Sequence, residues 1–372
     1  MKVLVATGIF PPDLGGPATY VPAFASACVR RGHSVHVVTY GNPLLPASEP
    51  YPVSRAPRLF LPIRYFLFFA SCLFRGFSAD VFFAQDAFSS GLPASCAAHL
   101  LRKRLVVKIV GDFSWEYARN SGITADTIDA FQRSIPASRI VRAIRFFQRA
   151  VCRRASSVIV PSAYLKGIVS GWGVDPGNIR VIHNAIPPSS ATLAPDPDPF
   201  LILSAGRLVS WKGFDGLIRA FARVLSEFPS ARLVIAGDGP CRDDLISCAT
   251  HAGVPGRVSF PGALPPPEMA RAYARAGCFA LFSSYEGMPH VLLEALLRRI
   301  PVIASDAGGT PELIRDGVNG MLVPSGDEAR LEGALLAFFR DPHTAVPHPG
   351  FPGGTDFTWN ELIERTISIL RE

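Results

Sequence analysis

The chain has 372 residues, 48% of them hydrophobic and 18% charged. This composition excludes a disordered protein, and the length exceeds what one hydrophobic core usually covers, so it favours two lobes. The seven cysteines are an odd number, and no two of them form a CxxC pair. We therefore expect neither a disulfide framework nor a cysteine metal site, and reduced thiols imply a cytoplasmic protein.

The positive charge is concentrated in the first half of the chain. Residues 1–198 carry 21 Lys and Arg against 11 Asp and Glu, whereas residues 199–372 carry 16 against 19. Much of this charge forms a stripe of arginines on one predicted helix. The stripe is either a solvated helix face or a contact with an anionic membrane surface. Nucleic acid is disfavoured as a partner because no recognised binding module accompanies the basic residues. The stripe consists of five arginines that recur every three or four residues on one predicted helix: Arg139, Arg142, Arg145, Arg149 and Arg153.

Two apolar segments bear on targeting and membranes. The opening MKVLVATGIFPPD has one lysine and a short apolar run that ends at Pro11-Pro12, which favours a first buried strand over a secretory signal. Pro62 and Arg64 interrupt residues 59–74 and leave about ten consecutive apolar residues, far fewer than the roughly 20 that span a bilayer. We expect no transmembrane helix there, and its aromatic side chains are either core or a peripheral membrane anchor.

Short apolar runs alternate with longer helical patterns along the chain, which predicts parallel sheets covered by helices. A proline-rich segment, PPSSATLAPDPDP, separates two sets of runs and predicts an extended linker. We expect a first domain over 1–186, the linker over 187–199, a second domain over 200–355 and a terminal helix within 356–372. The predicted strands are 3–7, 33–40, 81–84, 105–110, 157–160 and 179–182 in the first set, and 200–206, 231–237, 258–262, 278–282, 301–305 and 320–323 in the second.

Glycine turns follow several of these strands. Two doubly wound sheets bind ligands in the crevice beyond the carboxyl ends of their strands, so these turns are candidate binding loops. Neither half has the GxGxxG pattern with a later acidic residue that a dinucleotide-binding fold requires, which disfavours an oxidoreductase. The turns are Gly15-Gly16 after the first strand, Gly206-Arg207 after the first strand of the second set, and Gly237-Asp238-Gly239 after its second strand.

The segment SSYEGMPHVLLEA places two carboxylates around a helix start. Glu286 lies in a turn that contains Gly287 and Pro289, and residues 291–297 form a predicted helix with Glu294 in its second turn. The N–H groups at such a start suit a phosphate, whereas a carboxylate further along can accept both hydroxyls of a ribose. This combination predicts a nucleotide-sugar pocket.

Five segments of the second half, SAGRLVSWKGFDGLIRAF, LVIAGDGP, EGMPHVLLEA, PVIASDAGGTPELI and DGVNGMLV, together resemble the family-4 glycosyltransferases of the GT-B fold. In the first half the resemblance rests on Gly15-Gly16, SVIVPSAYLKGIV and VIHNAI, while VVKIVGDFSWE resembles one bacterial branch of the family. The closing FTWNELIERTISIL is similar to the terminal helix that crosses back to the first lobe in these enzymes. The resemblance implies an α/β protein of two Rossmann-like lobes with an interlobe cleft, and metal-independent transfer of a sugar from a nucleotide diphosphate with retention of the anomeric configuration.

Site residues follow from the chemistry and from the resemblance. The departing diphosphate develops negative charge, and Arg207 and Lys212 can stabilise it by a guanidinium fork and a mobile ammonium. Glu294 resembles the family's ribose-binding carboxylate, and Glu286 resembles the carboxylate near the donor sugar. The expected donor site is completed by the amides of Gly287 and Met288 and by Gly15, Gly16, Gly237, Asp238 and Thr310, the last in a loop that resembles the family's diphosphate loop.

The expected acceptor side departs from the family pattern. Many relatives carry a histidine at the end of the strand that corresponds to residues 105–110, whereas this chain has Gly111-Asp112. We assign the histidine's role to Asp112 and expect Trp115 and Glu116 to shape the acceptor side, with a core role for Trp115 as the alternative.

The sequence thus predicts a retaining glycosyltransferase that moves a sugar from a UDP- or GDP-sugar to a glycan or lipid-linked acceptor in cell-envelope synthesis. It needs no cofactor or metal, and it acts in the cytoplasm or at the inner face of the membrane. A non-hydrolysing nucleotide-sugar epimerase of the same fold and a non-catalytic sugar-nucleotide-binding subunit are the alternatives.

Overall fold

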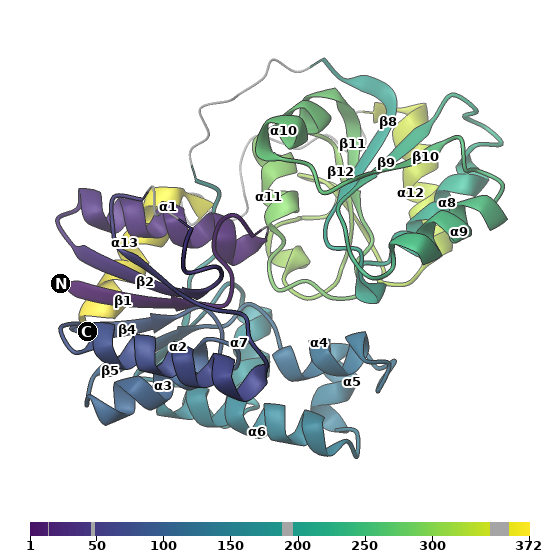
Figure 1. Cartoon of the computed structure of the whole chain (residues 1–372). Coiled ribbons are helices and arrows are strands. Elements are labelled where there is room, and N and C mark those ends of the chain that lie inside the picture. The colour runs from purple at the N-terminus through teal and green to yellow at the C-terminus, as the bar shows by residue number, and fades with distance from the viewer. Residues whose placement is uncertain (14, 46–48, 188–195, 343–356) are drawn as a thin grey trace. The chain divides into compact units, whose positions relative to one another are not determined.

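The computed structural model describes residues 1–13, 15–45, 49–187, 196–342 and 357–372 (Figure 1). The chain divides into two compact units, Met1–Pro187 with Asp356–Glu372, and Pro188–Thr355. Most of the predicted linker, residues 188–195, lies outside the described residues, as does the predicted domain boundary at 355. Each unit contains one parallel sheet covered by helices, which confirms the predicted α/β class.

The first unit contains a seven-stranded parallel sheet in the order β3-β2-β1-β4-β5-β6-β7. Its central strands are buried along most of their length because helices cover both faces, as is usual for parallel sheets. The strands are β1 (Lys2–Thr7), β2 (Ser34–Tyr40), β3 (Val53–Ala56), β4 (Val81–Ala84), β5 (Arg104–Lys108), β6 (Ser157–Val160) and β7 (Ile179–Val181). The helices are α1 (Gly16–Arg30), α2 (Leu61–Gly76), α3 (Gly91–Leu100), α4 (Phe113–Asn120), α5 (Ile128–Arg133), α6 (Arg139–Arg154), α7 (Ala163–Ser170), the 3-10 turn η1 (Pro176–Asn178) and α13 (Trp359–Arg371).

The terminal helix α13 belongs to the first unit, as predicted. Figure 1 shows α1 and α13 on one face of the sheet and α2, α3 and α6 on the other. Trp359 meets Tyr20 of α1 edge to face with ring centroids 6.0 Å apart, and Leu362 and Ile363 lie in the same core. Burial of this apolar face holds the end of the chain on the first sheet.

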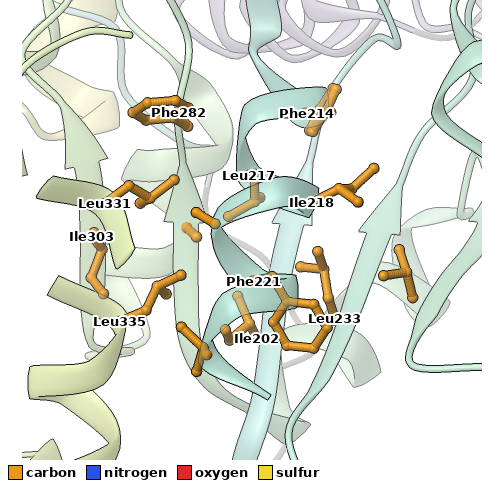
Figure 2. Packing of buried hydrophobic residues seen from close by; sticks show 14 of the residues in the cluster. Ile202, Phe214, Leu217, Ile218, Phe221, Leu233, Phe282, Ile303, Leu331 and Leu335 are labelled. Atoms are coloured by element: carbon orange, nitrogen blue, oxygen red, sulfur yellow. The ribbon is translucent and has the colours of Figure 1, made fainter. Parts of the chain in front are cut away.

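The second unit contains a six-stranded parallel sheet in the order β10-β9-β8-β11-β12-β13. Figure 2 shows Phe221 of α8 and Leu335 of α12 packed against strand residues such as Ile202. The strands are β8 (Asp198–Ala205), β9 (Arg232–Ala236), β10 (Val258–Gly262), β11 (Ala276–Leu281), β12 (Val302–Ser305) and β13 (Met321–Val323). The helices and 3-10 turns are η2 (Ser210–Lys212), α8 (Phe214–Val224), α9 (Arg242–His251), α10 (Pro266–Arg275), α11 (His290–Leu297), η3 (Thr310–Glu312) and α12 (Glu328–Arg340).

Each sheet reverses its winding direction once. In the first unit the chain runs outward from β1 to β3 and then resumes on the other side of β1 with β4; in the second it runs from β8 to β10 and resumes with β11. Ligands of doubly wound folds bind beyond the carboxyl ends of the strands at such a switch point. The topology therefore marks two places for ligands, one after β1 and β4 and one after β8 and β11.

The predicted arginine stripe on α6 does not face solvent as a whole. Arg145 is only 3% exposed, and its guanidinium donates to Gln132 Oε1 at 3.0 Å. Arg149 and Arg153 donate to main-chain carbonyl oxygens at 3.1 and 2.8 Å. The periodicity was correct, but the burial of Arg145 divides the stripe, because a helix turned toward the core at Val141 and Gln148 carries Arg145 inward with them.

The aromatic segment of α2 is partly core and partly surface. Phe68 is fully buried, whereas Phe66 and Phe74 are exposed. None of the helices in the described ranges is both long and apolar enough to cross a membrane.

Candidate active site

The candidate active site of the second unit lies at its switch point. Lys212 comes from the turn after β8, and Glu286 from the loop after β11. The ammonium of Lys212 lies 2.6 Å from Oε1 of Glu286, and the hydroxyl of Ser283 donates to the same oxygen at 2.7 Å. Glu286 is 6% exposed, so its charge is compensated by these two donors rather than by bulk water. The structure thus brings together two residues that lie 74 positions apart.

Two glycines allow the loops after β8, β11 and β12 to approach one another. Gly213, at φ 63°, ends η2, and a Cβ there would lie 2.0 Å from the carbonyl oxygen of Phe282. Gly308, at φ 59°, has the same relation to the carbonyl oxygen of Glu286, also at 2.0 Å. That carbonyl accepts the N–H of Gly309 at 2.8 Å. Both positions require glycine because of the left-handed backbone and the contact with main chain.

Arg207 lies beyond the end of β8 and is exposed. The preceding residue, Gly206, packs against the turn after β9, where a Cβ on Gly237 would lie 1.8 Å from the carbonyl oxygen of Gly206. The N–H of Leu208 donates to the carbonyl of Asp238 at 2.9 Å, which joins the two turns. Arg207 and Asp238, both exposed, therefore border one continuous loop surface at the carboxyl edge of this sheet.

Glu294 lies in the second turn of α11, as predicted, and is half-buried. Burial raises the pKa of its carboxyl, and a hydrogen bond with Tyr273 together with the charge of Arg298 opposes this rise. Thr310 is fully buried at the start of η3, and its hydroxyl has no hydrogen-bond partner within the described part of the chain. Gly287 and Met288 are buried in the loop between β11 and α11.

The remaining predicted donor residues, Gly15 and Gly16, belong to the first unit. They begin α1, where Gly15 occupies the N-cap position at φ 140° and both residues are exposed.

Asp112 has different surroundings from those expected. It is fully buried as the N-cap of α4, and its Oδ1 accepts the N–H groups of Ser114 and Trp115 at 2.9 and 3.2 Å. Gln132 donates to Oδ2 at 2.8 Å and Gln148 to Oδ1 at 3.1 Å. The carboxylate is occupied by side chains and amides of its own unit, so the geometry favours a positioning role over contact with a reacting sugar.

The two other acceptor-side candidates differ in exposure. Trp115 is 1% exposed, and its indole N–H donates to the carbonyl of Asp126 at 3.0 Å. This burial agrees with the alternative that Trp115 is a core residue. Glu116 is half-buried in the first turn of α4.

Sequence reasoning missed Ser283 and Tyr273. Ser283 was inside the quoted motif but carried no signal of its own, because serine is common in turns. Tyr273 comes from α10, and nothing in the sequence connects that helix to Glu294. Among the residues that the structure describes, no group of three or more His, Cys, Asp or Glu side chains could hold a metal ion.

Two doubly wound parallel sheets, with a cation and carboxylate pair beyond the strand ends of the second, indicate a ligand site at that edge. The sequence model of the Glycosyltransferase Family 4 matches residues 14–190, and that of the Glycosyl transferases group 1 matches residues 187–347. The chain therefore belongs to the group 1/family 4 glycosyltransferases, and it is a retaining enzyme that uses a nucleotide-sugar donor. The predicted family, fold and enzyme class are confirmed.

Individual relatives align over most of the chain. An uncharacterized glycosyltransferase of Methanocaldococcus jannaschii, MJ1607, is 28% identical over 100% of this chain and 98% of its own length. A GDP-mannose-dependent alpha-(1-6)-phosphatidylinositol monomannoside mannosyltransferase of Mycolicibacterium smegmatis is 26% identical over 92% of this chain and 91% of its own length. The structure of Anabaena HepE in complex with UDP-glucose superposes with a TM-score of 0.72 at 19% identity, covering 100% of this chain and 97% of that one. This last likeness shows the common fold.

Proposed function

We propose that this enzyme transfers a sugar from a UDP- or GDP-sugar to a lipid-linked or glycan acceptor of the cell envelope. The observation that carries the proposal is the Lys212–Glu286 pair at the β8/β11 switch point, with Arg207 at the same edge. The relatives support the class of substrates, since one is named for GDP-mannose and a phosphatidylinositol mannoside and another was solved with UDP-glucose.

The cations act on the leaving diphosphate. Lys212 shares its charge with Glu286, so Arg207 is the cation at this edge that an incoming diphosphate meets first. As the glycosidic bond breaks, negative charge grows on the phosphate oxygen, and both cations stabilise it. Glu286 accepts hydrogen bonds from sugar hydroxyls and favours the positive charge that builds at the anomeric carbon.

The anomeric configuration is retained when the acceptor attacks from the face that the diphosphate leaves. The leaving phosphate oxygen then accepts the proton of the acceptor hydroxyl, so no separate strong base is required. Holding the acceptor oxygen and the anomeric carbon at near-attack distance supplies several kcal/mol, roughly 7–11 at best. Glu294 binds the ribose hydroxyls, while the buried hydroxyl of Thr310 and the amides of Gly287 and Met288 face the phosphates.

We place the enzyme in the cytoplasm, with its first unit at the anionic inner face of the cell membrane. Arg139 and Arg142 remain exposed on α6, next to the exposed Phe146 and Phe147. Cations beside apolar side chains suit lipid headgroups and the acyl boundary beneath them.

A panel of nucleotide sugars, with nucleotide release as the readout, tests the donor assignment. Arg207→Ala and Glu294→Ala are each expected to lower kcat/KM about tenfold or more, since each removes a charge-assisted hydrogen bond to the donor. Arg257→Ala, an exposed arginine just before β10 at the opposite edge of the sheet, is the matched control and is expected to leave release unchanged. Binding of no donor, with a silent Glu294→Ala variant, would refute the site. Conversion of the donor sugar without any acceptor would instead identify an epimerase.

A further inference from the structure

The first unit has a cavity of about 450 Å³ at its own switch point. Gly8 directly follows β1, Tyr40 ends β2, and Ser89 follows β4; all three line the cavity. The cavity therefore lies at the carboxyl edge of three neighbouring strands, which is where a doubly wound sheet binds its ligand. All of its lining residues belong to the first unit.

The cavity is lined by two guanidinium groups and one carboxylate. Arg58 forms an ion pair with Asp13, the carboxylate in the lining. Arg64 is held by aromatic rings instead, with its guanidinium carbon 5.2 Å from the ring centroid of Tyr40 and 5.7 Å from that of Tyr65. Contact with aromatic rings fixes the position of a guanidinium but does not neutralise its positive charge. One positive charge in the lining is thus left without an anionic partner there.

A second carboxylate, Asp86, lies next to Ser89 but is not part of the cavity lining. Asp86 accepts the hydroxyl of Ser89 at 2.9 Å and the N–H of Phe88 at 2.8 Å, so it is occupied within the loop after β4. The lining itself carries two guanidinium groups against one carboxylate, which favours an anion with several oxygens, such as a phosphate ester, that two guanidinium groups can hold by paired hydrogen bonds.

The chain between the two arginines is apolar and exposed. Leu59, Phe60 and Leu61 are 49%, 67% and 58% exposed, and Ile63 on the first turn of α2 is 40% exposed. A contiguous exposed apolar patch is a feature of interaction sites. Because Arg58 and Arg64 flank them, the charged cavity and the apolar segment form one amphiphilic surface.

The geometry points to a lipid phosphate as the acceptor, with its phosphate between Arg58 and Arg64 and its hydrocarbon chain along residues 59–63. This inference rests on the proposed function, and it specifies the acceptor: an amphiphile that carries a phosphate near the hydroxyl that receives the sugar. The bond that forms joins the acceptor oxygen to the anomeric carbon, the bond that breaks releases the nucleoside diphosphate, and the hydroxyl proton leaves with that diphosphate.

Calorimetric titration of the full chain with farnesyl phosphate tests the inference, with farnesol and inorganic phosphate as partial ligands. Farnesyl phosphate is expected to bind at least tenfold more tightly than either partial ligand. Arg58→Gln and Arg64→Gln are each expected to weaken its binding about tenfold or more, and Phe60→Ser is expected to weaken farnesyl phosphate but not inorganic phosphate. Arg75→Gln, an exposed arginine at the other end of α2, is the matched control and is expected to have no effect.

Three outcomes overturn the inference: equal binding of farnesol and farnesyl phosphate, equal binding of inorganic and farnesyl phosphate, or the same loss in Arg75→Gln as in Arg58→Gln. Because Arg58 is half exposed, its variant keeps the test valid should Arg64→Gln fail to fold. Nucleotide-sugar binding measured in the same variants is expected to be unchanged. A chain that binds farnesyl phosphate but no nucleotide sugar would refute the proposed function alone.

Discussion

Replacing Asp112 with alanine tests whether this carboxylate holds the first unit together. Its two oxygens accept hydrogen bonds from the start of α4 and from Gln132 and Gln148, and Arg145 lies 3.8 Å away as an ion-pair partner. Burial lowers the pKa of Arg145, while the Asp112 charge acts in the opposite direction. Without Asp112, two glutamine amides lose their common acceptor, and a buried guanidinium loses the nearby negative charge that compensates it.

The expected loss of stability can be worked from these contacts. Removing a helix N-cap costs about 1 kcal/mol. Breaking a buried ion pair by removing one partner costs roughly 3–5 kcal/mol, and the 3.8 Å separation places this pair at the low end. We expect Asp112→Ala to lower the free energy of unfolding by about 3–4 kcal/mol in all, because the contributions are not additive.

Urea denaturation followed by circular dichroism measures the loss. Ser162→Ala is the matched control in the same unit: Ser162 caps α7 through one hydrogen bond to the N–H of Leu165 at 3.2 Å and pairs with no cation, so about 1 kcal/mol is expected. An Asp112→Ala protein that unfolds within 1 kcal/mol of the wild type, yet transfers sugar a hundredfold more slowly, would refute the positioning role and restore the catalytic one.

Two further predictions concern Gly308 at the candidate active site of the second unit and the buried Lys108 of the first unit. Gly308→Ala is expected to lower the transfer rate at least tenfold, because its Cβ would displace the carbonyl of Glu286; Gly317→Ala, with a similar φ of 68° and no atom within 4 Å, should carry only backbone strain and stay active in the same assay. Burial lowers the pKa of Lys108 to about 7, against about 10.4 in the unfolded chain. Between these two pH values only the unfolded state keeps the proton, so the free energy of unfolding rises with pH. Lys108→Met is expected to reduce the slope of the free energy of unfolding against pH, by at most about 1.4 kcal/mol per pH unit, in denaturation curves recorded from pH 7 to 10. An unchanged slope would contradict this prediction.

The sequence predicted the sheets well because buried parallel strands are short apolar runs. Every strand of the second unit overlaps a predicted run. The exception is β3 of the first unit, with the sequence VSRA, which was not predicted. It is an edge strand that is only half-buried along most of its length, so it shows neither a continuous apolar run nor an alternating pattern.

The side-chain partnerships were less accessible to sequence reasoning. Glu286 and Lys212 were both recognised as site residues, although their direct contact comes from two loops that only the fold brings together. Asp112 was assigned by its position after β5, whereas its real partners, Gln132 and Gln148, come from α5 and the middle of α6. Periodicity identifies a helical face, but it does not tell which polar side chains of that face turn into a buried network.

The two switch points show why one set of charged residues was predicted from the sequence and the other was not. The sheet order favours ligand binding after β1 and β4 and after β8 and β11, whereas the apolar runs predict the strands but not their order. The charges at each point come from loops: Arg207 and Lys212 follow β8 directly, so a motif at a strand end reveals them. Arg58 instead lies in the β3–α2 connection and Arg64 in the first turn of α2, where apolar neighbours suggest core or membrane contact. A binding site assembled from a neighbouring connection therefore becomes visible only once the sheet order is known.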